Sequence, residues 1–211
     1  METMIRINKN EEPDSWAAHR ETEGSEYEAT NDLRTALLIE QGYICAYCMR
    51  RIPVRDSVSS EESRIEHIQC RQNHPHLQLE YKNMLVCCPG CINGEEHCDK
   101  SKGNKDIHFS LFTDALPKSI TYSSKDGHIR SLNAEWDKDI NEVLSLNNIR
   151  LKNNRLQVIE GIIQSLNKAK WKTSELEQKL EEWTQKDFNG RLKPYCGVVI
   201  AFLIRKIREK A

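Results

Sequence analysis

The chain has no long hydrophobic run, few glycines and almost no net charge, and these absences exclude whole classes of protein. No apolar stretch approaches the roughly 20 residues of a membrane-spanning helix, and the mean hydropathy is −0.69. Residues 1–6 contain no apolar signal core, so we expect a cytoplasmic protein with no membrane partner. Only 9 of 211 residues are glycine, and no Walker-type loop occurs, so the chain carries no pattern for nucleotide binding.

The formal net charge of −1 hides an uneven distribution. Residues 148–211 hold 14 Lys and Arg against 7 Asp and Glu, whereas residues 1–147 hold 17 against 25. A basic C-terminal part suits an anionic partner such as nucleic acid. Solvated helix faces account for the same charges equally well, so charge alone does not choose between the two.

Hydrophobic periodicity and turn residues predict an α+β, mainly helical protein in four parts. Residues 1–42 form a polar segment that ends in a helix over 32–41, and residues 43–110 are the cysteine-rich part. A β-hairpin connection spans 111–133, with strands at 119–122 and 128–131 around Asp126-Gly127, and helices fill 134–211. Within the cysteine-rich part we expect a polar loop over 55–63, a strand over 64–68, a helix or turn over 83–86, an irregular insertion over 89–97 and a short helix from 98.

Cysteine is abundant, and seven of the eight cysteines fall between Cys45 and Cys98. In a cytoplasmic chain such clustering favours metal ligands over disulfides. Cys45 and Cys48 have the C-x2-C spacing with which one tight turn holds Zn²⁺. The second pair is open from spacing alone, because Cys88 can pair with Cys91 or with Cys98, and Cys87 and His97 lie nearby.

Between the cysteines lie residues suited to phosphodiester hydrolysis. The neutral imidazole of His67 can deprotonate water, and the carboxylate of Glu66 can bind a catalytic Mg²⁺ or Mn²⁺, which prefer oxygen ligands. Asn83 can offer a carbonyl to the metal or fix a loop through backbone hydrogen bonds. Asp99 can ligate the metal or cap a helix. Lys102 can contact a phosphate.

Together these residues resemble the HNH endonucleases. Glu66-His67, Asn83 and Asp99 lie at the family's three signature positions, and residues 98–103 resemble the Cys-Asn/His-x-x-Lys-Gly motif of its zinc-binding branch. The resemblance implies a zinc-bound ββα-metal nuclease core with structural Zn²⁺ on Cys45, Cys48, Cys88 and Cys98. Two features depart from the pattern: nine residues, rather than two, separate the last two cysteines, and Asp99 replaces the usual His or Asn.

Residues 40–105 are most similar to the PtuB group, the HNH subunits of Septu anti-phage systems that also accompany some retrons. The similarity is carried by residues 40–48, 65–67, 79–85 and 97–103, and by the insertion before His97. It implies a bacterial effector that cleaves DNA or RNA, tRNA included, under the control of a PtuA-like ATPase. A retron reverse transcriptase and its msDNA are further implied partners, and the C-terminal helices would dock a partner or bind nucleic acid.

Two other functions remain open for the same residues. One is a zinc-dependent module that binds nucleic acid or protein without cleaving it. The other is a redox protein that uses the C-x2-C pair, although the chain lacks the βαβ pattern in which such pairs occur.

Overall fold

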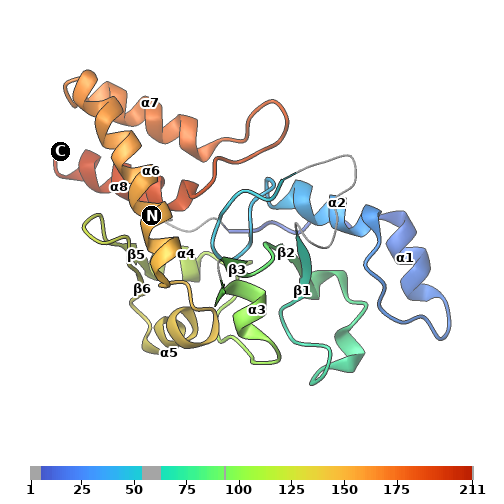
Figure 1. Ribbon diagram of the computed structural model, residues 1–211. Coiled ribbons are helices and arrows are strands. Elements are labelled where there is room, and N and C mark those ends of the chain that lie inside the picture. The colour runs from blue at the N-terminus through green and yellow to red at the C-terminus, as the bar shows by residue number, and fades with distance from the viewer. Residues whose placement is uncertain (1–5, 54–62, 93, 211) are drawn as a thin grey trace.

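The computed structural model describes residues 6–53, 63–92 and 94–210. The predicted α+β, mainly helical class is confirmed: helices dominate and the strands form small antiparallel hairpins (Figure 1). The polar loop predicted over 55–63 falls almost wholly on residues 54–62, outside the described part. The α-helices are α1 (Asp14–Glu21), α2 (Asn31–Glu40), α3 (Cys98–Lys102), α4 (Ala115–Ser119), α5 (Ala134–Lys138), α6 (Ile149–Lys168), α7 (Thr173–Thr184) and α8 (Cys196–Arg208).

The described strands pair only within hairpins. β1 (Arg64–His67) pairs with β2 (Met84–Cys87), β3 (Cys91–Ile92) with β4 (Glu95–Glu96), and β5 (Ile120–Tyr122) with β6 (Ile129–Ser131). The β5–β6 hairpin and the strand over 64–68 agree with the sequence prediction. The prediction of a helix or turn over 83–86 was wrong, because the four residues of β2 are all buried and pair with β1. A single helical turn, η2 (Tyr81–Asn83), precedes β2.

The helix predicted over 32–41 is confirmed as α2, which ends beside β2. Its N-terminus is capped by the side chain of Thr30, which accepts a hydrogen bond from the backbone N–H of Leu33. At its C-terminus the buried amide of Gln41 donates to the carbonyl of Val86 at 2.7 Å and accepts from the N–H of Val86 at 2.8 Å. The helix end is therefore fixed to the centre of β2. Helix α1 was not predicted, because Trp16 is its only buried side chain and no apolar stripe marks it.

The C-terminal helices α6, α7 and α8 lie together, at the opposite end of the molecule from α1 (Figure 1). The most apolar of them, α8, buries Val198, Val199, Phe202 and Leu203. A π-helical turn, η3 (Asp139–Val143), joins α5 to the segment that leads into α6. None of the helices in the described ranges is long and apolar enough to cross a membrane.

Buried Arg155 joins α6 to the β5–β6 hairpin. Its side chain donates hydrogen bonds to the carbonyl of Gly127 at 2.5 Å and to the carbonyl of Leu146 at 2.8 Å. Gly127 has a φ of +68°, and a Cβ there would lie 2.2 Å from the carbonyl oxygen of Lys152. Only glycine fits the hairpin turn against α6 at this position.

Candidate metal centre and adjacent carboxylate pocket

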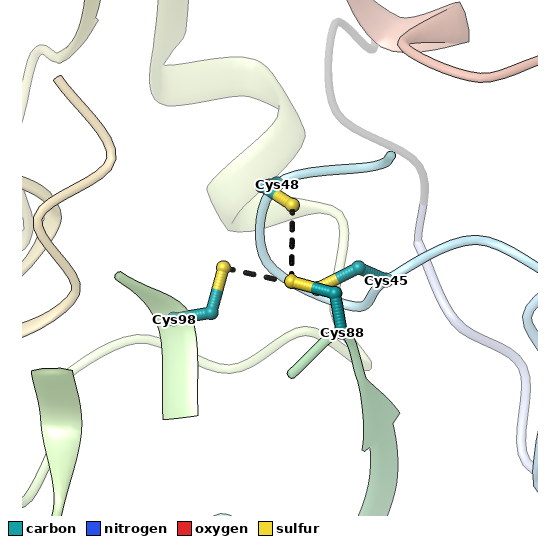
Figure 2. A group of neighbouring side chains, drawn as sticks. All are labelled: Cys45, Cys48, Cys88 and Cys98. Carbon is teal, nitrogen blue, oxygen red and sulfur yellow. Dashed lines mark hydrogen bonds between the residues drawn. The ribbon is translucent and has the colours of Figure 1, made fainter. Parts of the chain in front are cut away.

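Four cysteines from three segments form a buried cluster (Figure 2). The sulfur atoms of Cys45, Cys48, Cys88 and Cys98 all lie within 4.8 Å of one another. The Cys45–Cys98 and Cys48–Cys88 sulfur pairs are both 3.8 Å apart. Four converging thiols are the donor set of a tetrahedral structural Zn²⁺ site, so the chemistry of the cluster fits zinc.

Backbone hydrogen bonds hold the cysteine-bearing segments in place. The N–H of Ala46, between the first two cysteines, donates to the carbonyl of Val86 in β2 at 3.1 Å. Cys88 follows directly on the end of β2. Cys98 begins α3 with a φ of +55°, uncommon for a residue other than glycine, and its N–H donates to the carbonyl of Leu144 at 2.8 Å. The C-terminal half of the chain thus helps to place the fourth cysteine.

Without a cation the thiols of the cluster do not ionise alike. Burial alone would raise the pKa of Cys45, but hydrogen bonds with the neighbouring thiols hold this pKa well below its usual range. Burial raises the pKa of Cys48 and the pKa of Cys98 well above the usual range of a thiol. A hydrogen bond with Cys45 raises the pKa of Cys88, but hydrogen bonds with the other two thiols lower it more, to about 7. The four thiols therefore differ in how readily they ionise, and a bound cation would favour the thiolate form of all four.

The structure brings together the four cysteines that the resemblance implied. Cys91, the alternative from spacing, lies on β3, half-buried, where it pairs with Glu96. Buried His97 borders the cluster, and its Nδ1 lies 3.1 Å from the sulfur of Cys98 and 3.9 Å from that of Cys88.

Glu66 lies on β1, buried against the turn that carries the first two cysteines. Its Oε1 accepts hydrogen bonds from the hydroxyl of Tyr47 at 3.0 Å and from Nζ of Lys102 at 2.8 Å. Burial and then the neighbouring carboxyl of Asp99 raise the pKa of Glu66 to about 8, against the attraction of Lys102, which lowers it. Glu66 therefore gives up its proton less readily than an exposed carboxyl group does.

His67, the next residue on β1, is held as a neutral imidazole. Its Nε2 lies 2.9 Å from the carbonyl of Gln78, and since a carbonyl only accepts, the hydrogen sits on Nε2 and the lone pair on Nδ1. The ring of Tyr27 packs edge-on against the imidazole, with centroids 4.6 Å apart. Burial is the main cause that lowers the pKa of His67 to about 4. His67 is therefore an unprotonated base at neutral pH.

Glu66 and His67 line one pocket with Asp99. The pocket lies between β1, the loop after it and α3, and its volume is about 650 Å³. Asp99, the second residue of α3, is mostly buried and forms an ion pair with Arg64, with Nε and Oδ2 3.0 Å apart. The exposed Glu96 lines the pocket as well. The pocket thus combines an imidazole base with three carboxyl groups, which are the oxygen donors that Mg²⁺ and Mn²⁺ prefer.

Three cations lie around the same pocket: Arg64, Arg71 and Lys100. The guanidinium of Arg71 stacks over the ring of Tyr27, 4.5 Å from its centroid, and Lys100 pairs with Glu96 at 3.3 Å. The guanidinium and ammonium groups are donors of the kind that bind phosphate oxygens, although Arg64 and Lys100 are each paired with a carboxylate of the same pocket.

Lys102 does not reach the pocket as the sequence analysis expected. Its side chain is fully buried, and its Nζ donates to Glu66 and, at 3.1 Å, to the carbonyl of His67. This arrangement gives no support to a phosphate contact by Lys102, because the ammonium is engaged by two groups of β1 inside the protein.

Asn83 has the second of the two roles that its sequence position left open. Its Oδ1 accepts from the N–H of Gln69 at 2.9 Å, and its Nδ2 donates to the carbonyls of Gln69 at 3.0 Å and Leu77 at 3.2 Å. The amide is occupied in holding the loop that follows His67, so the structure does not present Asn83 as a metal ligand.

Sequence reasoning missed Tyr27, Tyr47 and Arg71. A signal existed for Tyr47, because it stands inside the C-x2-C turn and must lie beside the metal ligands. Tyr27 and Arg71 carry no local signal, since their importance arises only from contacts with each other and with His67.

Comparison with known protein families and with curated proteins finds no match to this chain, so the geometry of the cluster and the pocket carries the functional argument.

Proposed function

We propose that this chain is a metal-dependent endonuclease of the HNH type, which hydrolyses phosphodiester bonds in nucleic acid. The observation that carries the proposal is that Glu66, His67 and Asp99 line one pocket beside a buried four-cysteine cluster. The order β1, β2 and α3, with His67 on β1 and Asp99 on α3, also suits a ββα-metal core.

His67 acts as the general base in this proposal. The hydrogen bond from Nε2 to the carbonyl of Gln78 fixes the ring and leaves Nδ1 free to accept a proton from the attacking water. Edge contact with Tyr27 restricts the same ring from the side. Because its pKa is lowered to about 4, His67 needs no prior deprotonation at neutral pH.

Glu66 and Asp99 would hold the catalytic Mg²⁺ or Mn²⁺. When bound, such a cation stabilises the negative charge that develops on the phosphate and on the leaving oxygen. Carboxyl oxygens are the right donors for these hard cations, and the buried position of Glu66 limits competition from water.

Arg64, Arg71 and Lys100 take over the phosphate contact that sequence analysis had assigned to Lys102. All three line the pocket, and the guanidinium groups of the two arginines can bind phosphate oxygens in a bidentate manner. Arg71 is held in place by stacking on Tyr27, which also contacts His67. The ring of Tyr27 therefore contacts both the proposed base, His67, and the proposed phosphate-binding group, Arg71.

The resemblance to the PtuB group supports a wider setting for this activity. In that setting the chain is the effector of a bacterial anti-phage system, and a PtuA-like ATPase supplies the nucleotide dependence for which this chain has no motif. The helices α6, α7 and α8 would dock that partner or nucleic acid, and a retron reverse transcriptase with its msDNA would belong to the same assembly.

A cleavage assay tests the proposal. Purified wild type and His67→Ala are incubated with plasmid DNA and with total tRNA in Mg²⁺ or Mn²⁺, with and without a candidate ATPase, and with EDTA as the metal control. His76→Ala is the matched variant, because His76 lies exposed in the loop after β1. Cleavage that needs the metal, disappears in His67→Ala and persists in His76→Ala supports the nuclease and identifies its substrate.

A zinc-dependent binding module without cleavage is the second candidate. It is favoured by the engagement of both carboxyl groups inside the protein, Glu66 with Lys102 and Asp99 with Arg64. This reading predicts nucleic-acid or protein binding that is unchanged in His67→Ala, and no cleavage with any metal, substrate or partner.

A further inference from the structure

Tyr47 connects the four-cysteine cluster to the pocket. It stands in the tight turn between Cys45 and Cys48, and its ring is almost completely buried. Its hydroxyl donates to Oε1 of Glu66 at 3.0 Å. A turn of four residues thus supplies two thiols to the cluster and a hydrogen-bond donor to the carboxyl group in the pocket.

Helix α3 makes a second connection from the other side. Its first residue, Cys98, belongs to the cluster, and its second, Asp99, lines the pocket. Its last residue, Lys102, forms an ion pair with Glu66. Tyr47 and Lys102 donate to the same oxygen, Oε1, and so fix the carboxyl group of Glu66 from one side. Both donors belong to segments that also carry cysteines of the cluster: the turn of Cys45 and Cys48, and helix α3.

We infer that Tyr47 couples two metal sites, so that Zn²⁺ on the four cysteines raises the affinity of the pocket for a hard divalent cation. The inference rests on the proposed function, in which Glu66 binds that cation. Without zinc the turn keeps its backbone hydrogen bonds, such as the one from Ala46 to Val86, and its packing in the core, but it lacks the metal link from its two thiols to Cys88 and Cys98. Since zinc binding in such sites contributes directly to folding, its loss loosens the turn and displaces the donor to Glu66. Coupling of this kind is reciprocal, so the pocket cation also strengthens zinc binding.

Binding of Mn²⁺, followed by electron paramagnetic resonance of the free ion, tests the inference without any cleavage assay. Wild type and Tyr47→Phe are compared, each loaded with zinc and stripped of it. Tyr47→Phe keeps the buried ring and removes only the hydroxyl. We expect the zinc-loaded variant to retain its zinc and to bind Mn²⁺ roughly 10-fold or more weakly than wild type, as is usual when a residue that orients a metal ligand is changed.

Tyr81→Phe is the matched control. The hydroxyl of Tyr81 donates to Oε1 of buried Glu40 at 2.6 Å, so this variant removes the same kind of hydrogen bond at a site away from the pocket. Its Mn²⁺ affinity should equal that of wild type. Stripping zinc should weaken Mn²⁺ binding in wild type and have a much smaller effect in Tyr47→Phe, because the coupling group is already gone.

The outcomes separate the inference from the proposed function. If zinc-loaded Tyr47→Phe binds Mn²⁺ as tightly as wild type, the inference is overturned and the proposed function stands. If Glu66→Gln also binds Mn²⁺ as tightly as wild type, or wild type binds none, both fall. If Tyr47→Phe fails to hold zinc, the comparison is made between zinc-loaded and zinc-free wild type instead. Equal Mn²⁺ affinity of these two forms overturns the coupling.

Discussion

The ammonium of Lys102 lies 2.8 Å from a carboxyl oxygen of Glu66, and both side chains are buried. A lysine that follows the motif's Asp99 by three residues would be expected at the protein surface. Its position beneath β1 instead makes it part of the support for Glu66, together with Tyr47.

Replacing Lys102 with methionine should therefore destabilise the fold. The change leaves Glu66 with one donor fewer in a buried position, at a cost of roughly 1–3 kcal/mol in the free energy of unfolding. The double variant Lys102→Met/Glu66→Gln should recover part of the loss, because a neutral amide is cheaper to bury. Urea denaturation of wild type, Lys102→Met, Glu66→Gln and the double variant measures this, and additive effects of the two changes would contradict the pairing.

His67 should make the protein less stable in mild acid. Its folded-state pKa is about 4, whereas histidine in an unfolded chain has a pKa near 6.5. Between these values only the unfolded chain binds the proton, so stability conferred by neutral His67 is lost as the pH falls from about 6.5 toward 4.

His67→Gln tests this effect, because glutamine can still donate to the carbonyl of Gln78. Urea denaturation at about pH 7 and about pH 5 should show a smaller loss of stability for the variant than for wild type. The two proteins differ only at residue 67, so an equal loss would show that His67 is not held neutral by burial.

Removal of single cysteines should distinguish the cluster from its neighbours. Cys88→Ser removes one of the four converging thiols and should lose zinc and unfold at a lower temperature, since the metal contributes to folding. Cys91→Ser changes a half-buried residue on β3 and should retain about one zinc per chain. Zinc content by plasma emission spectrometry and thermal unfolding with and without a chelator check both, and zinc loss in Cys91→Ser alone would contradict the assignment.

Gly127→Ala should destabilise the contact between the β5–β6 hairpin and α6. The added Cβ would lie 2.2 Å from a backbone oxygen at a φ of +68°, so we expect a loss of more than about 1 kcal/mol. Gly161→Ala is the control within α6, where a Cβ meets nothing within 4 Å, and it should gain roughly 0.5–1 kcal/mol. Equal unfolding free energies of the two variants would contradict the account of the turn.

The parts of the fold that were predictable have local causes. Periodic leucines and Gly42 mark α2, and Asp-Gly between two short strand-like segments marks the β5–β6 hairpin. The strand β2 was missed because a short apolar run looks alike in a buried strand and in a helix, and only pairing with β1 decides between them.

In the candidate site, too, the features with local causes were predictable from the sequence and those that depend on distant contacts were not. Spacing marked Cys45 and Cys48 as a pair, and the family resemblance chose Cys88 and Cys98 to complete the cluster. The roles of Lys102, Asn83 and Tyr27 depend on contacts between segments far apart in the chain. The Tyr27–His67 contact, for instance, joins the segment between α1 and α2 to β1, and no local pattern encodes such a contact.

The rate of metal-dependent cleavage by His67→Ala and His67→Gln, beside wild type and His76→Ala, tests the central claim most directly. Both His67 variants lack the Nδ1 lone pair, although glutamine keeps the hydrogen bond to Gln78. The account predicts that each lowers the rate by roughly 10²–10⁴-fold, while His76→Ala cleaves like wild type. Cleavage by both His67 variants within a few-fold of wild type would contradict the assignment of His67 as the base and, with it, the proposed nuclease site.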